Sequence, residues 1–96
     1  MLFMLMATDA DETHEARMNA RENHLARLKQ LDQEGRLLIA GPNPLPDDPN
    51  HFSGSLIVAE FPSLDEAQAW AEKDPYVDAG VYEEILIRPF KQVFPQ

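Results

Sequence analysis

Two side chains in this sequence have the chemistry and the spacing to move a proton. His24 should lie on the buried side of a helix, because Leu28 and Leu31 follow it at helical spacing. Asp74 ends a second helical segment, directly before Pro75. A buried imidazole needs a partner, and a carboxylate on the neighbouring helix is the best candidate in so short a chain. Such an aspartate would orient one ring nitrogen and leave the other free as a general base near neutral pH.

The same pair also has a purely structural interpretation, in which it ties the two helices together. The surroundings of His24 depend on where its helix starts. Asn19 followed by Glu22 is typical of a capping pair, which would break the helix near residue 20. His24 would then lie close to a helix N-terminus, where the positive end of the dipole helps to keep the ring neutral.

Five further residues are candidates for substrate binding, namely Arg21, Gly41, Pro42, Ser55 and Tyr76. Arg21 shares a helical face with His24 and could bind an anionic or enolate oxygen; alternatively it is solvated and paired with Glu22 or Asp74. Ser55 could hydrogen-bond a ligand or be only a strand serine, because no Gly-x-Ser-x-Gly motif marks a nucleophile. Gly41-Pro42 is expected to end a strand and shape a turn beside the pocket. Tyr76 either offers its hydroxyl or packs in the core.

Neither a metal nor a cofactor is expected. His14 and His51 lie in polar stretches, and no His-x-x-x-His or His-x-His spacing occurs. The four glycines are isolated, which removes the usual nucleotide-binding signatures. The absence of cysteine excludes thiolate ligands and cysteine nucleophiles.

The composition is that of one globular domain over residues 1–96, with 44% hydrophobic and 26% charged residues. The formal charge of −9, without a basic cluster, opposes binding to nucleic acid or to an anionic membrane surface. Residues 1–6 are apolar, but they have no basic leader and acidic residues follow at once, which suits neither a signal nor a transit peptide. A cytoplasmic location is therefore expected.

Hydrophobic patterning predicts strands at residues 2–7, 36–40, 53–61 and 82–88, with helices at about 13–34 and 63–74. Residues 43–52 contain three prolines and are expected to form an irregular loop. The order βαββαβ predicts an α+β fold, the ferredoxin-like split-βαβ sandwich, with a four-stranded antiparallel sheet and two helices on one face.

The first three strands are apolar on both faces, at residues 2–6, 37–40 and 56–59. A sheet covered on one side should instead alternate apolar and polar residues. Two helices can cover only one face, so a second copy of the same sheet is the simplest cover for the other. The sequence therefore predicts a homodimer through the sheet face.

Several motifs, spread over nearly the whole chain, resemble the YCII-related domain family. They are Arg21-x-x-His24-Leu25-x-x-Leu28, Gly35-Arg36-Leu37-Leu38-x-Ala40-Gly41-Pro42, Gly54-Ser55, Ala67-x-x-Trp70-x-x-x-Asp74-Pro75-Tyr76 and Ala79-Gly80-Val81-Tyr82. That family belongs with the dimeric α+β barrels, relatives of muconolactone isomerase and several small monooxygenases. The resemblance implies a dimer packed sheet to sheet and an acid/base site built from His24 and Asp74. It also implies dehydrochlorination of a chlorinated hydroxyhydroquinone as the nearest enzymatic precedent.

Three functions are compatible with these residues. The first is a cofactor-independent enzyme in which His24 and Asp74 move a proton on a small cyclic or hydroxylated substrate, in an elimination or isomerisation. Hydrolysis fits less well, since it usually also needs an activated water and an oxyanion hole. The second is a metabolite-binding or regulatory module without turnover, and the third is a structural dimerisation domain.

Overall fold

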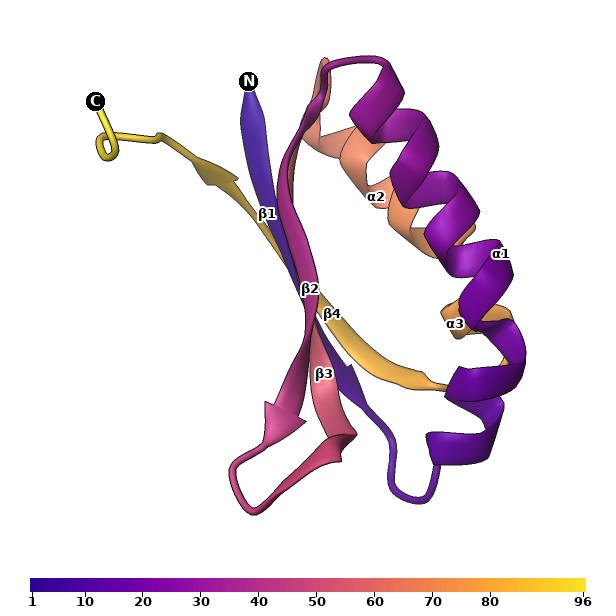
Figure 1. Ribbon diagram of the computed structural model, residues 1–96. Coiled ribbons are helices and arrows are strands. Elements are labelled where there is room, and N and C mark those ends of the chain that lie inside the picture. The colour runs from indigo at the N-terminus through magenta and orange to yellow at the C-terminus, as the bar shows by residue number, and fades with distance from the viewer.

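Four antiparallel strands form one sheet, and every helix lies on the same face of it (Figure 1). The computed structural model describes all residues, 1–96, as β1 (Leu2–Asp9), α1 (His14–Gln33), β2 (Leu37–Leu45), β3 (Asp48–Glu60), α2 (Leu64–Glu72), α3 (Pro75–Asp78) and β4 (Tyr82–Phe90). The strand order is β2-β3-β1-β4, and each neighbouring pair is antiparallel. The predicted ferredoxin-like split βαββαβ sandwich is confirmed.

The first helix is continuous, which corrects one expectation. α1 runs without a break, so Asn19 is an exposed interior position and not a cap. An asparagine inside a helix costs under about 1 kcal/mol, and the surrounding Ala, Arg, Leu and Glu residues are strong helix formers. His24 therefore lies in the middle of α1, out of reach of the dipole at its N-terminus.

The segment expected to be a loop is a β-hairpin. β2 continues through Gly41-Pro42, β3 starts at Asp48, and a tight turn at residues 46–47 joins them. Two expectations were wrong, namely the end of the strand at Ala40 and the irregular structure of residues 43–52. β2 is an edge strand, and proline is tolerated there because part of its N–H groups face no neighbouring strand. Gly41 and Pro42 therefore lie within a strand and shape no turn.

The second helical segment is divided in two. Ser63 caps α2, because its hydroxyl accepts the Glu66 N–H at 3.2 Å. α2 ends at Glu72, and Asp74 then caps α3, accepting the Tyr76 N–H at 2.9 Å. Pro75 takes the first helical position, where its missing N–H has no cost. Asp74 thus begins a third helix and does not close the second.

The core lies between the sheet and the helices. Phe3, Leu5, Ile57 and Ala59 supply it from β1 and β3, and Leu31, Ala67 and Ala71 meet them from α1 and α2. Trp70 packs against this cluster. No helix is both long and apolar enough to cross a membrane.

The other face of the sheet is apolar and has no cover within the chain. The strand register places Met4 beside Val58, and Met6 beside Leu56 and Leu86, on the side away from the core. Met6 and Leu86 keep 46% and 40% of their surface exposed. We call this surface the open face.

Candidate active site

His24 and Asp74 meet between α1 and α3. Nδ1 of His24 lies 2.9 Å from each carboxylate oxygen of Asp74, so the hydrogen bond expected from the sequence is present. The two residues expose only 5% and 2% of their surface. The backbone N–H of Tyr76 donates to the same carboxylate, and the Arg27 guanidinium lies 3.9 Å from it. A carboxylate is mainly a hydrogen-bond acceptor, so this contact favours the tautomer with the proton on Nδ1.

The second ring nitrogen of His24 is left for a ligand. Nε2 has no hydrogen-bond partner in the protein. Two side-chain polar atoms, Arg27 Nη1 and the Tyr82 hydroxyl oxygen, are fully buried and have no hydrogen bond. Nε2 is not one of them, so it keeps some contact with solvent. Nε2 is therefore the side of the ring that a pocket beside α1 can reach.

That pocket has a volume of about 150 Å³ and lies between α1 and the strands β2 and β3. A cavity of roughly this volume accommodates one benzene ring. Its polar wall is made by Arg17, Arg21, His24, Ser55 and Tyr76. Its remaining wall is apolar backbone and side chains, from Leu25, Leu28, Ala40, Gly41, Pro42 and Ile57. The site therefore combines a ring-sized apolar space with one imidazole nitrogen and two guanidinium groups.

The structure brings all the expected binding residues to this pocket. Arg21, Gly41, Pro42, Ser55 and Tyr76 line it together with His24, whereas Asp74 lies behind the imidazole and outside the lining. Arg21 forms no ion pair, so neither expected partner, Glu22 or Asp74, holds it. All five residues therefore line the pocket, and their roles in binding a substrate stay predictions.

A buried arginine that the sequence analysis missed supports one side of the pocket. Arg17 donates to Asp9 at 2.9 Å, to the Ser55 hydroxyl at 2.7 Å and to the Gly54 carbonyl at 3.0 Å. Burial lowers the pKa of Arg17, but the hydrogen bond and the charge of Asp9 outweigh it and raise the pKa above its ordinary value. The guanidinium therefore stays charged. The sequence did hold one sign that Arg17 is buried. Arg17 lies seven residues before His24, so the two residues share one face of the helix.

Tyr76 connects these two buried groups. The His24 ring stacks on it with centroids 4.0 Å apart and planes within 14°, and the Arg17 guanidinium lies 4.7 Å from its centroid. Burial raises the pKa of Tyr76 above its ordinary value. The hydroxyl is therefore protonated at neutral pH and can donate a hydrogen bond.

Tyr82, on β4, also packs edge-on against Tyr76, with centroids 5.4 Å apart. Its hydroxyl is buried near the Ser55 side chain, but no well-formed hydrogen bond joins the two. Burial raises the pKa of Tyr82 well above its ordinary value. In the sequence Tyr82 stood out only as part of a family motif, because a tyrosine at the start of a strand carries no signal of burial.

The two other histidines lie against each other. The rings of His14 and His51 are 4.2 Å apart, and His51 also pairs with Asp48 at 2.7 Å. The sequence analysis treated them as separate polar positions. Within residues 1–96 no group of three or more His, Asp or Glu side chains is arranged to hold a metal ion.

The fold defines a class of protein, the small ferredoxin-like α+β domains. The chain belongs to one family within it, because the model of the YCII-related domain matches residues 1–91. An Escherichia coli relative, Protein YciI, is 53% identical, and an uncharacterised Haemophilus influenzae protein is 51% identical. In both comparisons the match covers 98% of this chain and 100% of the relative.

Solved structures share this fold. The 5-chloro-2-hydroxyhydroquinone dehydrochlorinase of Burkholderia phenoliruptrix, solved in complex with 2,5-dihydroxybenzoquinone, is 26% identical. It superposes with a TM-score of 0.83 over 95% of this chain and 94% of the dehydrochlorinase. An antibiotic biosynthesis monooxygenase homologue from Nitrosomonas europaea is 15% identical, with a TM-score of 0.54 over 97% and 98% of the two chains. This second likeness shows the fold alone.

Proposed function

We propose that the protein is an enzyme that removes a proton from a small hydroxylated ring compound, with His24 as the general base and Asp74 as its orienting partner. One observation carries this proposal. Asp74 holds Nδ1 at 2.9 Å, while Nε2 is left open to a pocket of about 150 Å³. A purely structural pair has no need of a cavity at the second nitrogen.

The pocket suits a ring with an anionic or ionisable oxygen. Arg21 is the guanidinium in its wall without an ion pair, whereas Arg17 is neutralised by Asp9. In an elimination, Nε2 would take a proton from the substrate, and the electrons of the broken bond would first leave a negative charge on the adjoining ring oxygen as an enolate. Those electrons would then form the new double bond as the leaving group departs as an anion. In this proposal Arg21 stabilises the negative charge on that ring oxygen.

The dehydrochlorinase neighbour supports the substrate class, because its ligand is a hydroxylated six-membered ring. Elimination and isomerisation both need only a positioned acid/base group. No cofactor enters the proposed reaction. The proposal keeps the cytoplasmic location expected from the sequence.

The test uses 5-chloro-2-hydroxyhydroquinone and measures the release of chloride. We expect the wild type to accelerate release, and His24→Ala to lose about a hundredfold to ten-thousandfold of that rate, the usual contribution of a general base. Glu22→Ala, an exposed change on the same helix, is the matched control and should keep the wild-type rate. A wild type that binds 2,5-dihydroxybenzoquinone but turns over no ring substrate would instead be a metabolite-binding module.

We also propose that the protein is a homodimer through the open face. Methionine and leucine side chains there are half exposed, and a contiguous apolar face of this kind is typical of an interface. Light scattering at micromolar concentration should return about twice the chain mass of 10.9 kDa.

A further inference from the structure

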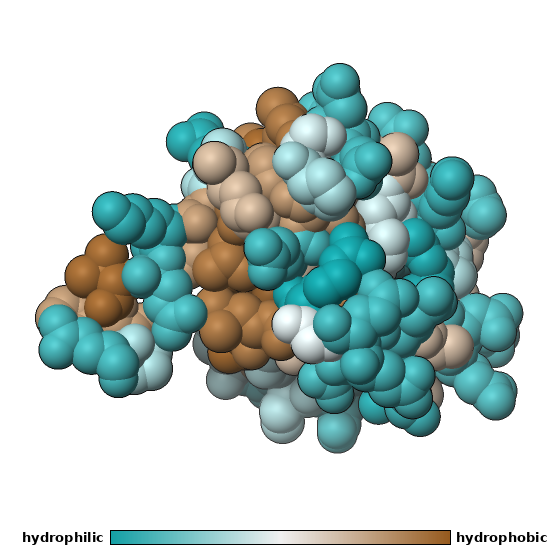
Figure 2. Space-filling model, turned by 90° about the horizontal axis from the view of Figure 1, so that it is seen from above, coloured by the Kyte–Doolittle hydropathy of each residue, from teal (hydrophilic) through white to brown (hydrophobic).

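The C-terminal tail, residues 91–96, stands away from the rest of the molecule. It leaves the end of β4 and points outward without folding back onto the sheet (Figure 1). Val93 exposes 60% of its surface and Phe94 exposes 74%, the highest value among the large hydrophobic residues of the chain. Seen from above, the tail and the neighbouring part of the body both carry hydrophobic side chains, with a hollow between them (Figure 2).

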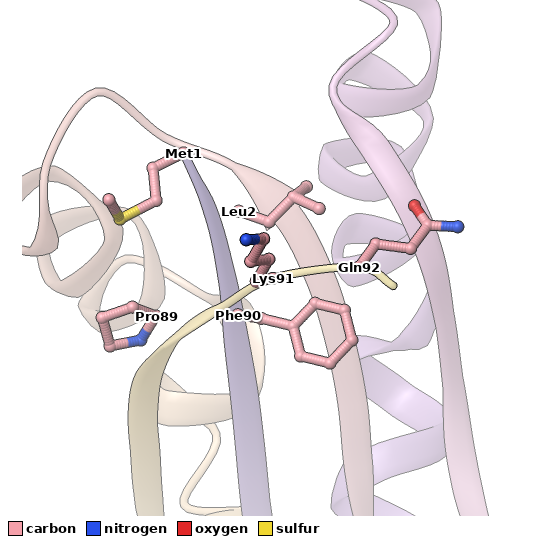
Figure 3. A pocket seen from close by; sticks show the side chains of 6 residues that line it. All are labelled: Met1, Leu2, Pro89, Phe90, Lys91 and Gln92. Carbon is pink, nitrogen blue, oxygen red and sulfur yellow. The ribbon is translucent and has the colours of Figure 1, made fainter. Parts of the chain in front are cut away.

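At the base of the tail lies a groove of about 540 Å³, lined by Met1, Leu2, Pro89, Phe90, Lys91 and Gln92 (Figure 3). Leu2 and Phe90 pair across β1 and β4, and their side chains point to the same side of the sheet. The lining is largely apolar, with Lys91 as the one charged side chain. We call it the terminal groove.

The terminal groove continues the open face. Strand alternation places Leu2 and Phe90 on the same side as Met4 and Met6, so one apolar surface runs from the middle of the sheet to its end. The charged positions on this side are Glu60, Glu84 and Arg88, which nearly balance. The chain as a whole carries a charge of −9, which would make two copies repel each other at most surfaces. On this face the net charge is small, so a second copy meets little like charge here.

We infer that the tail of each subunit docks in the terminal groove of its partner, with Phe94 as the anchor. This inference rests on the proposed homodimer. Two sheets packed face to face lie about 10 Å apart, and the four residues from Lys91 to Phe94 can span about 13 Å, so Phe94 can reach the partner sheet. A two-fold axis would use both tails and both grooves in the same way.

The natural absence of cysteine allows a direct cross-linking test. Chains carrying Leu2→Cys, in the groove, are mixed with chains carrying Val93→Cys, which keep the Phe94 anchor, and the mixture is oxidised mildly. Each chain has a single thiol, so any bond between positions 2 and 93 joins two subunits. We expect a disulfide-linked mixed dimer in high yield.

The matched control pairs Val93→Cys with Asn19→Cys, an exposed position on α1 and outside the groove and the open face. A yield for the groove pair that is no higher than for this control would overturn the inference. If the wild type is a dimer by light scattering but gives no specific cross-link, only the docking of the tail fails. If the wild type is a monomer, both the dimer and the docking fail.

A second measurement does not depend on cysteine. The double variant Val93→Ser, Phe94→Ser should raise the dimer dissociation constant about tenfold or more in sedimentation experiments, as loss of a buried aromatic anchor does at other interfaces. Both side chains are exposed within the subunit, so the fold should be unaffected. Gln96→Ser is the control. An unchanged dissociation constant in the double variant would contradict the anchor role of Phe94.

Discussion

Asp74 makes three contacts at once, and together they determine what His24 can do. Its carboxylate caps α3 through the Tyr76 N–H, lies near the Arg27 guanidinium and accepts from Nδ1 of His24. A carboxylate held by a backbone N–H cannot rotate away from the imidazole without losing the cap. The capping role therefore fixes the acceptor and, with it, the side of the ring that faces the pocket.

This arrangement predicts the tautomer of the neutral imidazole. Nδ1 should carry the proton and Nε2 should be unprotonated, because Asp74 can only accept. Long-range proton–nitrogen NMR correlations distinguish the two tautomers directly. Asp74→Asn should shift the population, whereas Asp78→Asn, an exposed change in the same short helix, should not. An Nε2-protonated ring in the wild type would contradict the assignment.

Tyr82 gives a prediction on stability and pH. Its buried hydroxyl has no partner, so Tyr82→Phe should be at least as stable as the wild type near neutral pH, because an unsatisfied buried group costs about 1–3 kcal/mol.

The pH dependence follows from the raised pKa of Tyr82 in the folded state. Above about pH 10 the unfolded tyrosine loses its proton while the folded one keeps it, so the unfolded state binds fewer protons and stability falls as pH rises. Urea unfolding above and below that pH should show a smaller loss for Tyr82→Phe. Equal losses in the two proteins would show that Tyr82 has an ordinary pKa.

At the scale of elements, α1 and the β2–β3 hairpin form opposite walls of the site, and they differed in how well the sequence predicted them. The stripe through His24, Leu28 and Leu31 was readable because helical spacing fixes which residues share a face. Arg17 lies on the same stripe, but its burial depends on Asp9, a partner from β1 that no local pattern identifies. Distant pairing of this kind appears only in the folded chain.

The hairpin was not predicted because proline was taken as a sign of a loop. Pro42 and Pro44 are compatible with a strand only where that strand has a free edge, and strand order is a property of the whole sheet. Asp74 shows the same limit. The pattern correctly placed a helix end before Pro75, but the start of α3 depends on a side-chain cap, which the sequence analysis did not consider.

β1 and β3 approach each other closely at Gly54, beside Arg17, and a substitution of this glycine tests whether that close approach is required. A Cβ at this position would collide with the Ala7 carbonyl on β1, so Gly54→Ala should destabilise the protein by about 1–3 kcal/mol, as overpacking does. Gly41→Ala is the matched control, because nothing lies near a Cβ there. The free energy of unfolding in urea decides between them. Equal free energies of unfolding for the two variants would contradict this prediction, because the strands could then move apart without loss of stability.

At the scale of the whole molecule, charge is distributed unevenly. The chain carries −9, yet the pocket is lined by two arginines and its two supporting carboxylates, Asp9 and Asp74, are each paired with a cation or an imidazole. We expect an acidic protein with a locally cationic pocket to repel polyanions and to favour a small anionic ring. The first expectation follows from composition alone, whereas the second requires the pocket.

The central claim is that Asp74 orients His24 for proton transfer, and Asp74→Asn tests it most directly. Asparagine is a good cap, so α3 should persist and the melting midpoint should change by only a few degrees, since about 1 kcal/mol corresponds to roughly 4–8 °C in a domain this small. Chloride release from 5-chloro-2-hydroxyhydroquinone should nevertheless fall by about a hundredfold to ten-thousandfold, because the amide favours the wrong tautomer. Asp78→Asn should match the wild type. A folded Asp74→Asn protein that releases chloride at the wild-type rate would contradict the account.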